Sequence, residues 1–334
     1  MNVRDKFKRP IKDLRISVID KCNFRCPYCM PKEIFGERYQ FLKNNELLTF
    51  EEIYEITKIF SKMGVEKLRI TGGEPLLRKD LAKLISKLKS INEIKEIALT
   101  TNGFLLKKFA QPLKDSGLDR LTVSLDSLNS ESYKELNGQN LDLNKTLESI
   151  EFAKYLGFEN IKINTVVMKG INEDQIINLA EFGRKNNLIV RYIEYMDVGN
   201  INGWKPEDVV NAEEIIRIIE KKYRLNPIGS NYYGEVASRY SFEDGKGEIG
   251  IISSVSKPFC ADCTRSRITA DGMMYTCLFT NKGHDLRSSI RNSNIEDVEQ
   301  FIKGIWENRS DQYSVLRSLG KLDSEKVEMF KIGG

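Results

Sequence analysis

Histidine is almost absent from this chain of 334 residues, in which His284 is the only one. A mechanism that needs two histidines is therefore excluded. Apolar runs of membrane-spanning length are also missing, and residues 1–15 are polar and basic without the apolar segment of a signal peptide. The formal net charge is only +4, too weak a positive balance to demand nucleic acid as a partner. We expect a cytoplasmic enzyme with no membrane or nucleic-acid partner and with a solvated amino-terminal arm.

Cysteine is scarce and concentrated. The six cysteines form two groups of three: Cys22, Cys26 and Cys29, then Cys260, Cys263 and Cys277. An even count would suit a disulfide framework in a short secreted chain, but this chain is long and groups its thiols in threes. Metal binding in a reducing compartment fits better. Structural zinc takes four Cys or His ligands, whereas three thiolates on an iron–sulfur cluster leave one iron open to a ligand that is not protein.

Two alternatives stay open at this point. The cysteines of the first group could be free thiols in a loop, where each would behave as a small apolar residue. The second group could form a Cys3His zinc site with His284. If it does not, His284 lies at the surface or next to the cysteines without binding metal, and the sequence assigns it no role.

Strand-like and helical patterns alternate from Leu14 to Met196, and this alternation predicts the fold. After the strand near Leu14, further strands are expected at Lys67–Thr71, Glu96–Thr100, Arg120–Asp126, Asn160–Val167 and Leu188–Met196. Amphipathic helices separate them, and the first begins at a capping box formed by Thr49 and Glu52. Repeated β-then-α units imply parallel strands with right-handed crossovers. Because six units are fewer than a closed eight-fold barrel needs, we expect an incomplete (β/α)6 barrel in an α/β protein.

Polar and apolar residues alternate within these strands, as in Leu14-Arg15-Ile16-Ser17 and Ile161-Lys162-Ile163-Asn164. Side chains alternate faces along a strand, so if the apolar set packs against the helices, the polar set faces the barrel interior. A closed barrel would fill that interior with aliphatic residues. We therefore predict a wet cavity suited to a large polar ligand. The alternative is an antiparallel sheet with its polar face in water.

The pattern changes near Leu225–Ser230, where we place a boundary between a domain at residues 1–225 and an α+β domain at residues 226–334. Strands are expected at Tyr232–Phe242 and Glu248–Ser253, joined by a turn at residues 244–247. Two short helices are expected around Asp285–Arg291 and Ile295–Glu307. The second domain carries the second group of cysteines.

The spacing C-x3-C-x2-C, with Tyr28 before the last cysteine, resembles the signature of radical S-adenosylmethionine (SAM) enzymes. Gly72-Gly73-Glu74-Pro75, at a strand-to-helix turn, resembles the GGEP element of the same superfamily, although a Gly-Gly pair alone is also typical of a tight turn without a ligand. The resemblance implies a [4Fe–4S] cluster on Cys22, Cys26 and Cys29 that binds SAM, within an incomplete barrel. The SAM contacts that it implies are Tyr28, Gly73, Ser124 and Met196, to which we add Asn164 from its cavity-facing position.

Both cysteine groups, the GGEP element, the run Cys263-Thr264-Arg265-Ser266-Arg267 and the Gly333-Gly334 end together resemble the GTP 3′,8-cyclase family of molybdenum cofactor biosynthesis. This resemblance implies a second [4Fe–4S] cluster on Cys260, Cys263 and Cys277, with the guanine of GTP on its open iron. The residues that it implies for GTP are Arg15, Arg69, Thr100, Lys162, Arg265, Ser266 and Arg267. The Gly333-Gly334 tail would reach into the active site.

The implied reaction is radical: a 5′-deoxyadenosyl radical derived from SAM removes the 3′ hydrogen of GTP, and the C3′ radical attacks C8 of guanine. An electron donor is required, and the product would pass to a cyclic pyranopterin monophosphate synthase; a homodimer stays open. Three other readings are another two-cluster radical SAM enzyme that modifies peptides, a non-enzymatic iron–sulfur electron carrier, and a zinc-bearing nucleic-acid binder. An electron carrier would coordinate every iron with protein and would have no use for the cavity.

Overall fold

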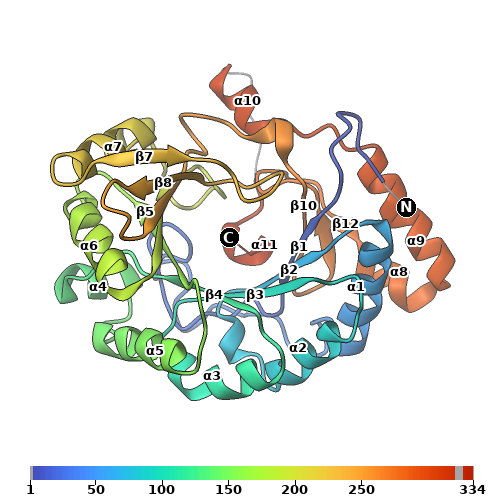
Figure 1. The fold of residues 1–334 in the computed structure, drawn as a ribbon. Helices are drawn as coiled ribbons and strands as arrows, with labels where there is room; N and C mark the ends of the chain where they lie inside the picture. The colour runs from blue at the N-terminus through green and yellow to red at the C-terminus, as the bar shows by residue number, and fades with distance from the viewer. Residues whose placement is uncertain (1–2, 320–325, 334) are drawn as a thin grey trace.

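The computed structural model describes residues 3–319 and 326–333. Within these ranges the strands form one twelve-stranded sheet in the order β12-β11-β10-β1-β2-β3-β4-β5-β6-β9-β8-β7. The sheet curves, and most helices lie on its outer side while the short helix α11, Met329–Ile332, lies within the curve (Figure 1). None of the helices in these ranges combines the length and apolar character of a membrane span.

Six parallel strands form the centre of the sheet in chain order, which confirms the predicted (β/α)6 repeat. They are β1 Asp13–Ser17, β2 Lys67–Thr71, β3 Glu96–Thr101, β4 Arg120–Ser124, β5 Lys162–Val167 and β6 Ile189–Glu194. The helices between them are α1 Phe50–Met63, α2 Leu81–Lys89, α3 Leu106–Asp115, α4 Ser130–Asn137, α5 Leu143–Tyr155 and α6 Ile176–Asn186, and α7 Ala212–Glu220 follows β6. Short 3-10 turns occur at η1 Pro75–Leu77, η2 Glu173–Gln175, η3 Pro206–Asp208 and η4 Cys260–Asp262.

Helix α1 begins as predicted. The Thr49 side chain accepts a hydrogen bond from the Glu52 amide at 3.1 Å, and the Glu52 carboxylate accepts one from the Thr49 amide at 2.7 Å. Such a cap stabilises a helix by about 1 kcal/mol. Helix α4 was not expected; it begins at Asn129, whose side chain caps the amides of Glu131 and Ser132.

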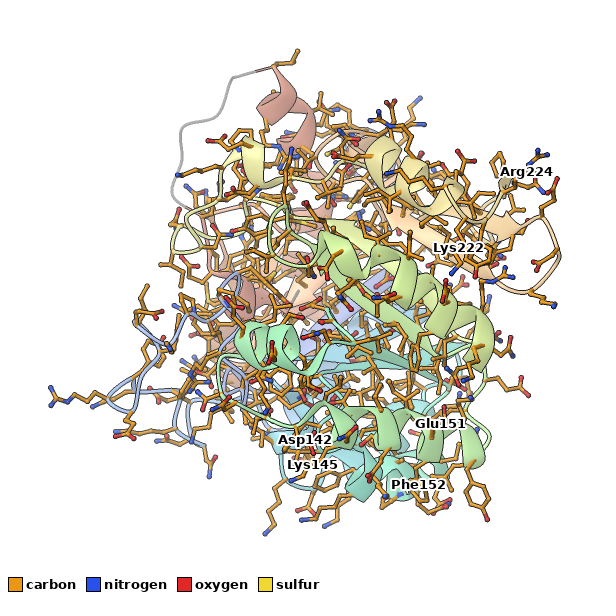
Figure 2. The ribbon with its side chains drawn as sticks, turned by 90° about the vertical axis from the view of Figure 1, so that its left-hand side faces the viewer. Asp142, Lys145, Glu151, Phe152, Lys222 and Arg224 are labelled. Carbon is orange, nitrogen blue, oxygen red and sulfur yellow. The ribbon has the colours of Figure 1, made fainter. Side chains whose placement is uncertain are left out.

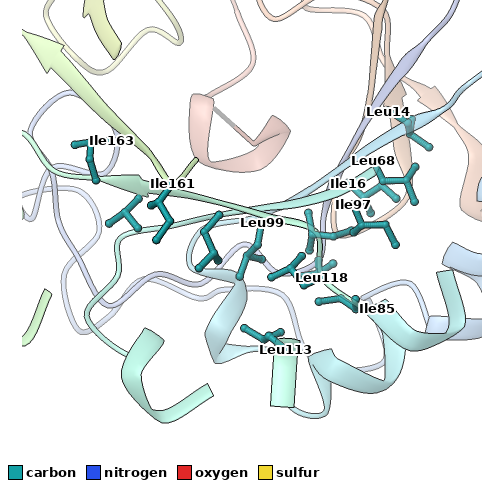
Figure 3. Close-up of a cluster of buried hydrophobic side chains, with 14 of the residues drawn as sticks. Leu14, Ile16, Leu68, Ile85, Ile97, Leu99, Leu113, Leu118, Ile161 and Ile163 are labelled. Atoms are coloured by element: carbon teal, nitrogen blue, oxygen red, sulfur yellow. The ribbon is translucent and has the colours of Figure 1, made fainter. Parts of the chain in front are cut away.

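The apolar core lies between the sheet and the helices (Figure 3). Leu14 and Ile16 of β1 are 0% and 1% exposed and belong to the same buried cluster as Ile85 of α2 and Leu113 of α3. Each such side chain stabilises the fold by roughly 1.5–3 kcal/mol. The predicted alternation is therefore confirmed, and the antiparallel alternative is wrong for these six strands. Charged side chains cover the outer surface (Figure 2), among them Asp142, Lys145, Glu151, Lys222 and Arg224.

Residues after 225 extend both edges of this sheet. Beyond β6 lie β9 Glu248–Ile252, which is parallel to β6, then the antiparallel strands β8 Ser238–Phe242 and β7 Leu225–Ile228. Beyond β1 lie β10 Arg265–Ile268, which is parallel to β1, then β11 Met273–Tyr275 and β12 His284–Asp285. The chain continues with α8 Leu286–Asn292, α9 Ile295–Glu307 and α10 Tyr313–Ser318. One sheet thus runs across the boundary predicted at 225/226, and that division stays a prediction.

Three expectations about particular segments need correction. The predicted hairpin is present, but its first strand starts at Ser238 and not at Tyr232, and the strand β7 was missed. The amino-terminal arm is not a solvated tail: Val3, Asp5, Arg9 and Ile11 are buried. The arm is held by specific contacts, because the Trp306 indole Nε1 donates to the Arg9 carbonyl at 3.2 Å.

Candidate active site

A cavity of about 280 Å³ lies on the inner face of the sheet and is lined by both cysteine groups. Cys22, Cys26 and Cys29 come from the loop after β1, and Cys260, Cys263 and Cys277 come from around β10 and β11. The two groups are brought together because β10 pairs with β1 in parallel, with Arg265 opposite Asp13 and Arg267 opposite Arg15. This pairing joins segments about 250 residues apart, a separation typical of tertiary contacts that local patterns do not reveal.

The first cysteine loop is held by its own backbone and by Arg25. The amides of Cys29 and Met30 donate to the Cys26 carbonyl at 3.0 and 2.8 Å. The Arg25 guanidinium donates to the carbonyls of Phe35 and Cys22 at 2.6 and 2.8 Å. All three thiols are thereby held at the cavity wall without forming disulfides.

Burial controls the ionisation of the first cysteines. It raises the pKa of Cys22 to about 12, with the Glu74 carboxylate adding to the effect. Burial also raises the pKa of Cys26 and of Cys29, and there the neighbouring thiols add to the effect. Metal binds the thiolate form of cysteine. Burial disfavours this charged form, and the positive charge of bound iron would favour it. The donor set of three partly buried thiols on one loop therefore fits an iron–sulfur cluster.

Two arginines face the second cysteine group, the buried Arg309 and the partly buried Arg265. Burial alone would raise the pKa of Cys263, but the guanidinium groups of Arg265 and Arg309 lower it to about 6. Their Nη2 atoms lie 3.3 and 3.1 Å from the Cys263 sulfur. Burial raises the pKa of Cys277 to about 12. This group also fits a cluster, since at least one thiol is held as the thiolate that a metal requires.

The zinc alternative for the second group is not formed. His284 lies on β12, paired with Met274, and its ring packs near Phe301 at 6.4 Å between centroids. Across residues 3–319 and 326–333 no three His, Cys, Asp or Glu side chains converge on a single metal ion. An iron–sulfur cluster does not require its thiolates to meet at a single metal ion, because each thiolate binds a different iron.

The glycines of the GGEP turn have a packing reason as well as the implied ligand role. A Cβ on Gly73 would lie 2.3 Å from the Lys21 carbonyl oxygen, and one on Gly72 would lie 2.6 Å from that of Ile19. The turn therefore packs directly against the backbone that leads into the first cysteine loop. Glu74 fixes the turn to β3 by accepting from the Thr101 hydroxyl at 2.7 Å and the Asn102 amide at 2.8 Å. Burial raises the pKa of Glu74 to about 7.

A set of cations lies on the inner face of the strands, where the alternation predicted Arg15, Arg69 and Lys162. Arg15 on β1 is partly buried. The others are buried: Arg69 on β2, Lys162 on β5, Arg191 on β6 and Arg267 on β10. No ion pair in the described part of the chain includes any of the five. The Nε atoms of Arg15 and Arg69 and the Thr100 hydroxyl are buried and have no hydrogen-bond partner among residues 3–319 and 326–333. Buried polar groups are nearly always paired, so this set indicates a missing anionic ligand.

These cations also destabilise one another. Burial and the neighbouring Arg267 and Arg69 lower the pKa of Arg15. Burial, then Arg191 and Arg120, lower the pKa of Lys162 from 10.5 to about 7. Burial and Arg69 lower the pKa of Arg191 to about 9. An anion in the cavity would reverse each of these shifts.

The structure brings most of the predicted site residues to the cavity. Those on its wall are Arg15, Cys22, Cys26, Tyr28, Cys29, Arg69, Gly73, Thr100, Ser124, Asn164, Met196, Cys260, Cys263, Arg265, Arg267 and Cys277. Lys162 shares a face of β5 with Asn164 but lies one step nearer the start of the strand, beyond the cavity wall.

Ser266 is also absent from the cavity wall, and its side chain faces the other side of the sheet. It pairs with Leu14, is completely buried, and its hydroxyl donates to the Tyr275 carbonyl. The reason is the period of the strand: Arg265 and Arg267 face the cavity, so the residue between them faces the helices. The Ser266 side chain therefore does not face the cavity, and the GTP contact predicted for Ser266 stays a prediction.

The carboxy-terminal segment enters the cavity region. The Gly333 carbonyl accepts a hydrogen bond from Arg267 Nη1 at 2.6 Å, and Phe330 packs edge-on against Phe35 at 4.8 Å in the loop after Cys29. Asp197, in the loop after β6, binds residues nearer the carboxy terminus. It accepts hydrogen bonds from the Tyr313 hydroxyl at 2.8 Å and from Lys326 Nζ at 2.7 Å. Gly334 lies outside the described residues.

Three side chains in or next to this site were not predicted. Arg191 faces the cavity, and its Nε donates to Asn164 at 2.9 Å; the alternation along β6 could have identified it. Asp126 accepts from the Tyr28 hydroxyl at 2.6 Å, and burial raises its pKa to about 6. Arg309 contacts Cys263 from beyond α9, and no local pattern marks it.

Two family models match this chain: Radical SAM superfamily over residues 16–183 and Molybdenum Cofactor Synthesis C over residues 188–315. The GTP 3′,8-cyclase of Staphylococcus epidermidis is 47% identical over 337 residues, which span 99% of each chain. That of Acidothermus cellulolyticus is 50% identical over 342 residues, covering 99% of this chain and 94% of its own. Streptococcus suis SuiB, solved bound to S-adenosylmethionine, is similar in fold, with a TM-score of 0.62, 18% identity, and coverage of 92% of this chain and 68% of its own.

Proposed function

This chain belongs to the GTP 3′,8-cyclase family of radical SAM enzymes, and from that premise we propose that it converts GTP to 3′,8-cyclo-7,8-dihydro-GTP, the first step of molybdenum cofactor biosynthesis. The single observation in the structure that best supports this substrate is the set of inward-facing cations, none of which has an ion pair within the described residues. A nucleoside triphosphate carries about four negative charges at neutral pH, because each phosphoryl group is an anion. Fixed guanidinium forks on Arg15, Arg69 and Arg267 suit its oxygens.

Two [4Fe–4S] clusters would be held at opposite parts of this cavity. Cys22, Cys26 and Cys29 would bind the first, and Cys260, Cys263 and Cys277 the second. When bound, the first cluster and SAM would supply the radical chemistry by which C3′ of GTP becomes joined to C8. Cofactors of this kind supply the difficult chemistry, and the protein supplies placement and the exclusion of water.

The residues of this chain have separate tasks in that placement. Tyr28, Gly73, Ser124 and Met196 would contact SAM, with Asn164 nearby. Arg15, Arg69, Thr100, Lys162, Arg265 and Arg267 would hold GTP, with Arg191 as an addition from its position opposite Asn164. Asp126 fixes the Tyr28 ring through the hydrogen bond to its hydroxyl. The Gly333 end, bound to Arg267, would limit the cavity on the GTP side.

The family resemblance also implies two partners, one that acts before the reaction and one that acts after it. An electron donor must reduce the first cluster, and the product would pass to a cyclic pyranopterin monophosphate synthase. We place the reaction in the cytoplasm, because thiols that bind clusters need a reducing compartment. A homodimer stays a prediction.

The rival reading is a two-cluster radical SAM enzyme that modifies a peptide. The likeness to SuiB does not favour it, because similarity at 18% identity extends to the fold alone. The inward-facing cations do not favour it either, since a neutral peptide segment would leave them unpaired.

Anaerobic reconstitution followed by iron analysis and nucleotide binding tests the proposal. We expect about eight irons per chain for two [4Fe–4S] clusters, and stronger binding of GTP than of guanosine. Four irons, bound zinc, or equal affinity for GTP and guanosine would contradict it. Replacing Arg69 with alanine should weaken GTP binding more than SAM binding, and an equal loss of both would contradict the division of the cavity.

A further inference from the structure

Arg309 reaches the second cysteine group with two nitrogens of one guanidinium. Its Nη1 donates to the Cys263 carbonyl at 2.8 Å, and its Nη2 donates to the Cys263 sulfur at 3.1 Å. A rigid fork that grips both the backbone and the sulfur of one residue fixes the side-chain direction of that residue. None of the residues predicted for SAM or GTP occupies this position.

Arg309 is itself held in place by carboxylates. Its guanidinium lies 3.4 Å from Asp5 and 3.1 Å from Asp311, and the Arg309 and Asp5 side chains are 1% and 0% exposed. The Lys6 amide also donates to the Arg309 carbonyl at 3.2 Å. The arm at the start of the chain thus fixes an arginine near its end, and both are buried beside the cysteine loop.

Arg9 completes the arrangement from the other side of that loop. Its Nη1 donates to the Cys260 carbonyl at 2.7 Å and to the Asp311 carbonyl at 2.9 Å, while its Nε pairs with Asp5 at 2.5 Å. Asp5 therefore bridges two arginines, one at each end of the turn η4 from Cys260 to Asp262. Removing these charges from water costs free energy, and only close ion pairs and hydrogen bonds to the remaining polar groups offset that cost.

We propose that Arg309, held by Asp5 and Asp311, is a positioning residue for the second cluster: it aims the Cys263 thiolate at its iron and raises the reduction potential of that cluster by an N–H···S hydrogen bond. Hydrogen bonds and positive charge at cluster sulfurs favour the reduced state, whose negative charge is greater. This inference rests on the proposed second cluster but concerns its electronics, not its presence.

The second cluster would bind substrate and not SAM, so its potential decides whether electrons stay on the first cluster. A raised potential would make it a sink for electrons unless substrate on its open iron changes that balance. Arg309 would thereby influence the fraction of reduced protein that is competent for SAM cleavage.

The test is a redox titration of the reconstituted holoprotein, followed by electron paramagnetic resonance, on the wild type, Arg309→Gln and Arg309→Lys. The signal that changes on addition of GTP identifies the second cluster. We expect its midpoint potential to be more negative in Arg309→Gln, and to be partly restored in Arg309→Lys, which keeps the charge. The signal that changes on addition of SAM should keep its potential.

Arg184→Gln is a matched control. Arg184 is also a largely buried arginine paired with a carboxylate, Asp244, but it lies at the β7–β8 end of the sheet. A shift of the same size in this variant would overturn the proposal. So would an Arg309→Gln protein that keeps eight irons and an unchanged midpoint. Loss of only the GTP-sensitive cluster, with the SAM-sensitive signal intact, would support the positioning role.

Asp5→Asn covers the case in which Arg309→Gln fails to fold. Asparagine keeps the shape of Asp5 but removes the negative charge that offsets Arg9 and Arg309. We therefore expect a less negative midpoint potential, opposite to the shift in Arg309→Gln, and an unchanged potential would overturn the proposal. A wild type with four irons is a distinct result, because it would remove the proposed function and the second cluster with it. Eight irons and no effect of Arg309 would remove the inference alone.

Discussion

The pH dependence of GTP binding should be dominated by Lys162. This side chain is 7% exposed, has no ion pair in the described part of the chain, and has a pKa lowered to about 7 by burial and by Arg191 and Arg120. Near pH 7 the ligand-free protein therefore contains both the charged and the neutral form of Lys162. Lys162 does not line the cavity, but it lies close enough to Arg69 and Arg191, which do, for their charges to lower its pKa. A triphosphate bound to those arginines would restore the charge of Lys162, because a nearby anion favours the protonated ammonium.

The size of the change in GTP affinity with pH follows from how far the pKa of Lys162 is lowered. The change from 10.5 to about 7 disfavours the charged form by roughly 5 kcal/mol, at about 1.4 kcal/mol per pKa unit. If bound GTP returns the pKa to its ordinary range, affinity falls about tenfold for each pH unit above 7, and close to one proton is taken up on binding at pH 8. The phosphate groups add little to this slope, because their last pKa is about 6.

Calorimetry under anaerobic conditions tests this prediction between pH 7 and 8.5. Titrations in two buffers of different ionisation enthalpy give the number of protons taken up. Lys162→Met should bind GTP more weakly, with little dependence on pH and no proton uptake. Lys107→Met, which removes an exposed lysine paired with Glu148, should behave as the wild type. A flat wild-type profile, or an equal slope in Lys162→Met, would refute the reasoning.

Three further changes test other parts of the structure. Cys26→Ser should abolish formation of 5′-deoxyadenosine from SAM while about four irons remain; continued SAM cleavage would contradict the role of the first group. Asp197→Asn should loosen residues 326–333, because it weakens the contacts with Tyr313 and Lys326, and limited proteolysis should then cleave the tail faster, with unchanged resistance counting against this role. Leu14→Ala should lower the free energy of unfolding by about 2–5 kcal/mol in a denaturant titration, and a loss below 1 kcal/mol would mean that the site repacks.

Much of the barrel could be predicted because its signals are local. The alternation in β1 and β5 identified which side chains face the helices, and the Thr49 and Glu52 pair marked the start of α1. The spacing of the first cysteines gave the candidate cluster site. Each of these features depends on neighbours within a few residues along the chain.

The remainder depends on contacts between distant segments. No local pattern indicates that β10 adds to β1, although this pairing brings the second cysteine group to the cavity and turns Ser266 away from it. The buried network of Asp5, Arg9 and Arg309 joins both ends of the chain, and a basic, polar arm resembles a solvated tail when its partners are unknown. Charged residues become buried only when paired, and the pairing is a property of the fold.

The central claim is that one cavity holds SAM against the ribose of GTP. Incubating the reduced, reconstituted protein with SAM and GTP deuterated at C3′ tests it directly. We expect 5′-deoxyadenosine that carries one deuterium, formed together with a cyclised nucleotide. Unlabelled 5′-deoxyadenosine, or labelled 5′-deoxyadenosine without a cyclised nucleotide, would contradict it.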